Sequence, residues 1–139
     1  MEDKMYREYQ LKRMKNYVLP ETVYRQALWA VKDLNRLKEE LNKAVENVDN
    51  IHSPNFFNES IGSGYYSDIT AKKADKLIAL TNRIEGIETA LFSIPERYRE
   101  GIKGKLVDGK SYGDEFHPNT WKKWQQVYIF NVAKNLGLI

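Results

Sequence analysis

The octapeptide GKLVDGKS, from Gly104 to Ser111, matches the phosphate-binding P-loop pattern, in which two glycines separated by four residues precede Lys and Ser. Such a loop binds nucleotide phosphates when a strand precedes it and a helix follows it, because its backbone N–H groups then converge on the phosphates. Here the preceding residues have a helical pattern, and Tyr112 and Gly113 follow in place of a helix start. We therefore interpret the match as coincidental and predict no nucleotide cofactor.

Other groupings of reactive side chains are sparse. The sequence has no cysteine, which excludes disulfides, thiolate metal sites and cysteine nucleophiles. His52 and His117 fall in separate turn-rich segments without carboxylates at ligand spacing, and Glu39 and Glu40 point to different sides of a predicted helix. The sequence therefore predicts no catalytic residue, no metal site and no cofactor, and we expect a protein that is not an enzyme.

The charge of the chain is unevenly distributed. The 139 residues carry a net charge of +3, with basic segments at 1–19 and 95–139 and an acidic segment at 20–94. This pattern slightly favours an anionic partner. No stretch is apolar over the thickness of a bilayer, so we expect a cytoplasmic protein that makes no contact with membranes.

Two long segments repeat apolar residues at alternating steps of three and four. Such a 3.5-residue period is typical of helices that pack along one another as in a coiled coil. We predict an all-α protein in which residues 20–94 form a long antiparallel helical hairpin; a dimer that uses the same stripes is the alternative. The stripes are Val23, Ala27, Ala30, Leu34, Leu37, Leu41, Ala44 and Val48, then Leu77, Leu80, Ile84, Ile87, Leu91 and Ile94.

A connecting loop is predicted over residues 50–67, where Pro54, Gly62 and Gly64 interrupt the helical pattern. The second helix of the hairpin is expected to begin at Ser67 or Asp68. The aromatic residues of this loop either cover the end of the hairpin or contact a partner; they are Phe56, Phe57, Tyr65 and Tyr66.

Residues 95–139 form the last predicted unit, after a basic extension at 1–19 and the hairpin at 20–94. Ser93, Pro95 and Glu96 have the spacing of a capping box and predict a helix that begins near Pro95. A turn-rich break follows, and the final helix is expected to begin at Asn119 or Thr120 and to end at Gly137.

The final helix has two predicted faces. One is apolar and consists of Trp121, Trp124, Tyr128, Val132 and Leu136. The other carries Lys122, Lys123 and Gln126, which suit contacts with DNA phosphates and base edges. Two helices across a short break, with basic side chains on both, predict a helix-turn-helix. An ordinary amphipathic helix with a solvated basic face is the alternative.

The segment IPERYREGIKGKLVDGKSYGDEF, followed by NTWKKW, resembles region 4 of sigma-70-family factors. More of the chain, from about Tyr17 to Ile139, is similar to the phage-encoded, sigma-region-4-like late transcription regulators of the ArpU and RinA type. The similar stretches include YVLPETVYRQALWAVKDLNRLK, SDITAKKADKLIAL and HPNTWKKWQQVYIFNVAKNLGLI. The resemblance implies a C-terminal sigma-like helix-turn-helix that binds DNA near phage late promoters and works with host RNA polymerase.

Between Ser111 and Thr120 the chain is several residues shorter than the sigma pattern, so the first helix of the motif is expected to be abbreviated or replaced by a loop. The resemblance places seven side chains at the DNA, two of them in the turn and five on the last helix. They are Lys110, Ser111, Asn119, Thr120, Lys122, Lys123 and Gln126.

We therefore expect a sequence-specific DNA-binding regulator of phage late genes. Its expected partners are double-stranded DNA, RNA polymerase and a second copy of the chain bound through the long helices. Two alternatives remain: a small terminase-like DNA-packaging protein, and a helical interaction module that binds no DNA.

Overall fold

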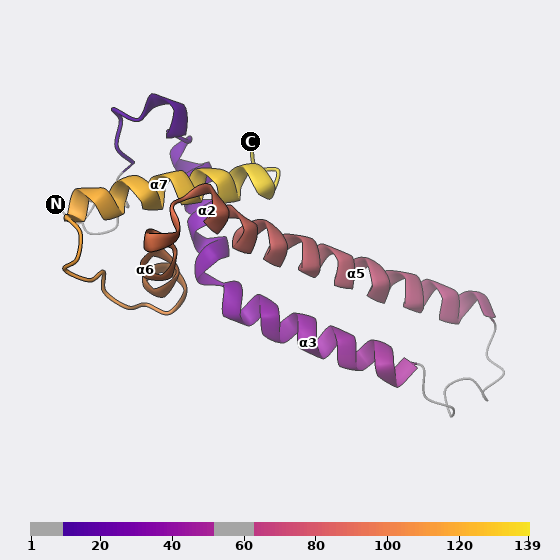
Figure 1. Ribbon diagram of the computed structural model, residues 1–139. Helices are drawn as coiled ribbons and strands as arrows, with labels where there is room; N and C mark the ends of the chain where they lie inside the picture. The colour runs from indigo at the N-terminus through magenta and orange to yellow at the C-terminus, as the bar shows by residue number, and fades with distance from the viewer. Residues whose placement is uncertain (1–9, 52–62) are drawn as a thin grey trace. The chain divides into compact units, whose positions relative to one another are not determined.

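The structure is a computed structural model that describes residues 10–51 and 63–139, with side chains over 10–46 and 71–139. Every regular element in these ranges is a helix, so the predicted all-α class is confirmed (Figure 1). The elements are η1 (Lys15–Tyr17), α2 (Glu21–Lys32), α3 (Leu34–Ile51), α5 (Ser63–Thr89), η2 (Ala90–Ser93), α6 (Glu96–Val107) and α7 (Pro118–Asn135), where η denotes a short 3-10 helix. None of the described helices has the length and apolar character to cross a membrane.

The chain divides into two compact units. The first contains the residues up to Asp33 together with Gly86–Ile139, and the second contains Leu34–Glu85. This division differs from the predicted boundaries at 19 and 94, because α2 and the end of α5 belong with the C-terminal helices.

Helix α7 is the central element of the first unit. It packs against α2, α6, η1 and η2. Its buried side chains point in nearly all directions around the helix axis; they are Trp121, Gln125, Gln126, Val127, Tyr128, Ile129, Val132 and Ala133. Apolar side chains of α2 and α6 complete the core, and burying one large aliphatic side chain contributes roughly 1.5–3 kcal/mol.

The apolar stripe from Val23 to Val48 does not lie on one continuous helix, because the helix is interrupted at Asp33 between α2 and α3. The Asp33 N–H donates to the carbonyl oxygens of both Trp29 and Ala30, at 3.0 and 3.2 Å, which tightens the last turn of α2. The apolar register continues through this break, since Ala30 and Leu34 are both buried. Periodicity alone therefore gave no signal for it.

The junction before α6 was predicted correctly in position but not in its capping. Helix α6 begins at Glu96, directly after Pro95. Ser93 does not cap it, because its hydroxyl donates to the carbonyl oxygen of Ala90 at 2.6 Å. Instead, Arg99 reaches back and its Nε donates to the carbonyl oxygens of Leu91 and Ile94, at 2.9 and 3.1 Å.

The other predicted helix starts are shifted by a few residues. Helix α7 begins at Pro118, and its N-cap is His117, whose Nδ1 accepts from the Asn119 N–H at 3.1 Å. Helix α5 begins at Ser63, before the predicted start at Ser67 or Asp68. The predicted end of α7 is confirmed, since Gly137 follows it with a φ of 73°, which is typical of a helix C-cap glycine.

The second unit consists of α3 and the greater part of α5. Leu34, Leu37, Leu80 and Ile84 are buried. Farther along the two helices, Val45 and Ile78 are 44% and 59% exposed. Side chains of both helices border one hollow of about 330 Å³; they are Glu40, Lys43, Ala44, Lys73 and Lys76. Most of the predicted loop, including Phe56 and Phe57, lies outside the described residues.

Gly101 of α6 allows a close approach of the Trp121 side chain of α7. A Cβ atom built on it would lie 2.6 Å from Cζ3 of the Trp121 ring. Replacing glycine by alanine inside a helix normally stabilises it by up to about 1 kcal/mol. Here we expect Gly101→Ala to lower the free energy of unfolding by about 1–3 kcal/mol, because the rigid ring has to move.

Gly104→Ala is the matched control, since its Cβ would meet only the flexible Lys110 side chain, at 3.8 Å. We expect this variant to be neutral or slightly stabilised. Urea unfolding followed by circular dichroism compares the two, and equal stability of both variants would contradict the close packing.

Tyr128 links the core to the end of α5. Its buried hydroxyl donates to the Ile87 carbonyl oxygen at 3.1 Å. Burial raises the pKa of the Tyr128 phenol well above its ordinary value, and the nearby Glu88 carboxylate raises it further.

Because the folded pKa of Tyr128 exceeds the unfolded one, its stabilising effect is complete below about pH 10 and is lost as pH rises further. We expect Tyr128→Phe to cost about 0.5–1.5 kcal/mol at neutral pH. The variant should also lose less stability than the parent between neutral and strongly alkaline pH. Unfolding measured across this pH range tests both points; a parallel decline would contradict the role of Tyr128.

Candidate nucleic-acid interface

Gln126 lies in the core and not on the outer face of α7, so its predicted contact with DNA is wrong. Its side chain is 1% exposed. Its Oε1 accepts from the Leu11 N–H, and its Nε2 donates to the carbonyl oxygens of Leu11 and Tyr17, at 3.3 and 3.0 Å. The physical reason is that a segment far away in the sequence supplies the amide with backbone partners that make its burial favourable.

The N-terminal segment Gln10–Leu19 is consequently folded against α7. The Tyr17 ring meets the edge of Phe130, with ring centroids 5.3 Å apart. Leu19 is buried, and its backbone N–H and carbonyl oxygen are both bonded by the Gln10 side chain. The described part of the predicted extension at 1–19 is thus part of the first unit.

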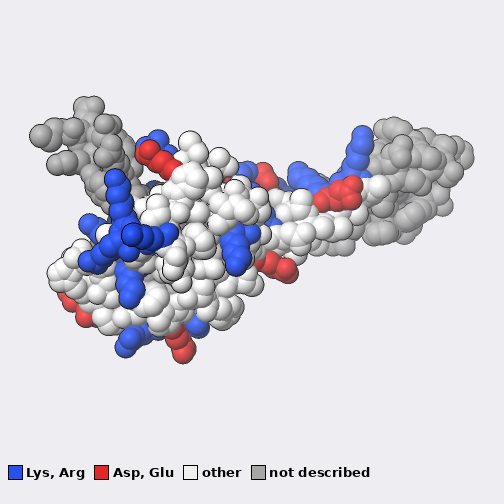
Figure 2. Space-filling model, turned by 90° about the horizontal axis from the view of Figure 1, so that it is seen from above, with Lys and Arg blue, Asp and Glu red and all other residues white. Residues whose placement is uncertain are grey.

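This packing brings basic side chains from the two ends of the sequence to the same part of the unit. We call the exposed set Lys12, Arg13, Lys15, Lys122 and Lys123 the basic surface. Lys122 and Lys123 precede Gln126 by about one helical turn of roughly 5.4 Å, and the other three lie in the segment that Gln126 bonds. Figure 2 shows Lys and Arg side chains gathered over one end of this unit.

The basic surface lacks internal neutralisation. Of its five side chains, none forms an ion pair with a carboxylate in the described part of the chain; the Arg25–Glu21 and Arg36–Glu40 pairs lie elsewhere. Residues 10–33 and 86–139 together carry thirteen Lys and Arg against eight Asp and Glu. A concentrated positive field of this kind attracts polyanions.

The remaining predicted DNA contacts fall into two groups. Asn119 is exposed and Thr120 half-buried in the first turn of α7, beside Lys122 and Lys123. Lys110 and Ser111 are exposed in the loop after α6, where the Lys110 N–H donates to the Gly104 carbonyl oxygen at 3.0 Å. The P-loop match therefore begins inside a helix and ends in a loop.

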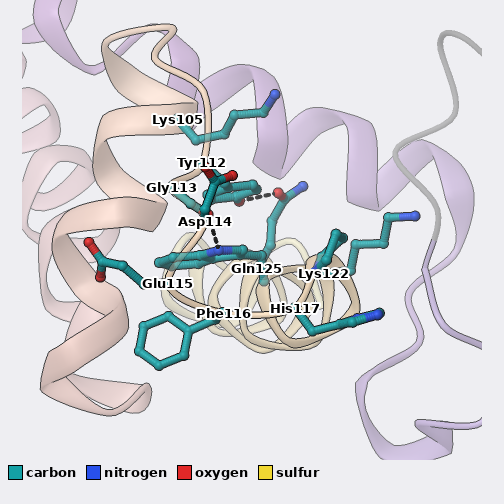
Figure 3. A pocket seen from close by; sticks show the side chains of 11 residues that line it. Lys105, Tyr112, Gly113, Asp114, Glu115, Phe116, His117, Lys122 and Gln125 are labelled. Carbon is teal, nitrogen blue, oxygen red and sulfur yellow. Dashed lines mark hydrogen bonds between the residues drawn. The ribbon is translucent and has the colours of Figure 1, made fainter.

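The connection between α6 and α7 runs through residues 108–117 without a helix, whereas a helix-turn-helix normally has a turn of three or four residues. Tyr112 anchors this loop to α7. Its ring stacks on Trp121 with centroids 4.7 Å apart, and its hydroxyl donates to Gln125 Oε1. The Trp121 Nε1 in turn donates to the Gly113 carbonyl oxygen at 3.3 Å (Figure 3).

A hollow of about 590 Å³ lies beside the start of α7. Tyr112 and Trp121 supply aromatic lining, while Lys105 and Lys122 border it with positive charge. Figure 3 shows Lys122 and His117 directed to one side and Glu115 to the other. The side of the hollow that carries Lys122 is continuous with the basic surface.

Sequence reasoning missed the three cations of the N-terminal segment as site residues. Their only signal was the positive charge of residues 1–19, which does not tell where that segment lies.

Comparison of the chain with protein-family models, with curated proteins and with solved structures finds no match. The resemblance to sigma region 4 and to phage late regulators therefore stays a prediction.

Replacing Gln126 tests how the basic surface is assembled. We expect Gln126→Met to lower the free energy of unfolding by about 1–3 kcal/mol, because partly buried backbone groups of Leu11 and Tyr17 lose their partner. Trypsin should also cleave faster after Lys12, Arg13 and Lys15.

Asn131→Ala is the control for this variant, because the Asn131 amide donates to the Val127 carbonyl oxygen of its own helix, at 2.9 Å, and does not bond the N-terminal segment Gln10–Leu19. Mass spectrometry of the early tryptic fragments locates the cuts. If Gln126→Met is cleaved no faster than the control, Gln126 does not hold the N-terminal segment.

Proposed function

We propose that this chain binds double-stranded DNA through its basic surface and acts as a transcription regulator. The observation that carries the proposal is the set of hydrogen bonds by which Gln126 holds the segment of Lys12, Arg13 and Lys15 against α7, about one turn after Lys122 and Lys123. Cations without carboxylate partners release counterions from DNA when they meet its phosphates, and this release supplies much of the affinity.

The start of α7 is the part of this helix that suits a DNA groove. In its middle turns α7 is buried on most sides, whereas Lys122 and Lys123 near its N-terminal end are exposed. Asn119 and Thr120 lie at this end, where the positive end of the helix dipole favours phosphate oxygens. In helix-turn-helix proteins, too, the N-terminal residues of the second helix contact the base edges.

The biological role follows from the resemblance to phage late regulators. The first unit would contact promoter DNA, with α6 and α7 in the roles of a sigma-like helix-turn-helix whose intervening helix is replaced by the loop at 108–117. The second unit, with α3 and α5 as a helical hairpin, would bind RNA polymerase or a second copy of the chain. The exposed Val45 and Ile78 offer apolar contacts for either partner.

The double variant Lys122→Ala, Lys123→Ala tests the DNA site. We expect weaker binding to duplex DNA and a salt dependence whose logarithmic slope falls by about two, because each lost phosphate contact removes about 0.9. Fluorescence anisotropy of a labelled duplex, titrated at several salt concentrations, measures both quantities.

The double variant Lys72→Ala, Lys76→Ala is the matched control, since it removes the same charge from exposed positions of α5 in the second unit. It should retain the slope of the parent protein. Equal losses in the two variants would place the contact elsewhere. Failure of the parent to bind duplex at low salt would favour a helical interaction module that binds no DNA.

A further inference from the structure

A second set of side chains on the first unit combines two aromatic rings with two lysines. Trp29 is 65% exposed on α2, although most large apolar side chains of that helix are buried. Lys32 Nζ lies 5.1 Å from the centroid of the Trp29 ring. Lys105 Nζ of α6 lies 5.6 Å from the centroid of the Tyr112 ring. We call Trp29, Lys32, Lys105 and Tyr112 the aromatic–lysine track.

The track is continuous along the surface of the unit. Lys32 and Lys105 border one hollow of about 390 Å³, together with Leu106, Val107 and Gly109. Lys105 and Tyr112 border the larger hollow beside α7. Because Lys105 belongs to both hollows, the track runs from α2 across the end of α6 to the loop before α7.

Neither lysine of the track is neutralised in the described part of the structure, where Lys32 and Lys105 form no ion pair with a carboxylate. Their stems lie against aromatic rings, so the ammonium groups can swing toward another anion while the ring faces become available. An exposed indole next to mobile cations is the combination that binds an unpaired strand, because bases stack on the ring and phosphates meet the lysines.

We infer that the aromatic–lysine track binds single-stranded nucleic acid. One base stacks on Trp29, the phosphates that flank it meet Lys32 and Lys105, and a further base reaches the hollow beside Tyr112. Duplex DNA cannot use the track in this way, since its bases are stacked and paired inside the helix. The four residues of the track do not belong to the basic surface, although Lys122 of that surface borders the far side of the hollow beside Tyr112.

The hollow beside Tyr112 also contains carboxylates that oppose a nucleic acid. Asp114 and Glu115 border it, and Figure 3 shows Glu115 directed away from Lys122. The phosphates of a bound single strand therefore lie near Lys32 and Lys105 and away from these carboxylates. Removing the negative charge of Asp114 should strengthen binding of the single strand, whereas the changes to Trp29, Lys32 and Lys105 should weaken it.

Binding of a labelled oligothymidylate of about ten nucleotides, measured by fluorescence anisotropy at low salt, tests the track. We expect Trp29→Ala to weaken binding roughly ten-fold, because stacking of one base contributes this much. The double variant Lys32→Ala, Lys105→Ala should lower the logarithmic salt slope by about 1.4, at about 0.7 for each phosphate contact with a single strand. Asp114→Asn should bind more tightly than the parent.

Phe92→Ala is the matched control, because Phe92 is 72% exposed and has the Arg99 guanidinium 4.9 Å from its ring centroid, yet lies outside the track. It should bind the oligonucleotide like the parent. Quenching of tryptophan fluorescence provides a second readout, since Trp121 is buried and Trp124 half-buried, which leaves Trp29 as the most exposed indole. Circular dichroism verifies that each variant is folded.

Three outcomes would overturn the inference: a parent protein that does not bind the oligonucleotide, a Trp29→Ala variant that binds as tightly as the parent, or equal losses in Trp29→Ala and Phe92→Ala. Competition by polyglutamate as effective as that by unlabelled oligothymidylate would also overturn it, because the track would then recognise charge alone.

The test separates this inference from the proposed duplex site. The double variant Lys12→Ala, Lys123→Ala should reduce duplex binding and spare the oligothymidylate, because neither side chain borders the two hollows of the track. Trp29→Ala should do the reverse. If the parent protein binds only one of the two nucleic acids, the proposal for the other one fails.

Discussion

The burial of two neighbouring glutamines in α7 is the constraint on which the rest of the first unit depends. A primary amide inside an apolar core is unfavourable unless its donors and acceptor are bonded. Gln126 bonds the backbone of Leu11 and Tyr17, and Gln125 bonds the hydroxyls of Tyr112 and Tyr24. Each amide thereby fixes a segment that lies outside the α-helices against the central helix: the N-terminal segment in one case and the loop of Tyr112 in the other.

These two segments carry side chains that form the candidate binding sites on the surface of the first unit. The one bonded by Gln126 carries Lys12, Arg13 and Lys15, and the one bonded by Gln125 forms part of the hollow beside α7. The core thus has a role beyond stability, because the hydrogen bonds of Gln125 and Gln126 determine where charged and aromatic side chains lie on the surface. The proposed sites for duplex and for single strands both follow from this arrangement.

The sequence predicted those features that depend on local chemistry. Pro95 and Gly137 marked helix boundaries because proline and glycine restrict or permit particular backbone angles, and the exposure of Lys122 and Lys123 followed from their position on α7. The break at Asp33 could not be predicted, because the apolar repeat continues through it. The burial of Gln126 could not be predicted either, since its partners lie more than a hundred residues away and no local pattern encodes them. The cations of the N-terminal segment were overlooked as site residues for the same reason.

The contact of the N-terminal segment and α2 with the last helix has a consequence for the order of folding. During synthesis, the apolar face of α2 leaves the ribosome long before α7 exists to cover it. The two parts of the first unit can meet only when the intervening residues Leu34–Glu85 form a closed loop. Loop closure has an entropic cost and slows folding. A growing chain of this protein therefore exposes α2 until α7 has been made, and a chain truncated before α7 has no means of completing the unit.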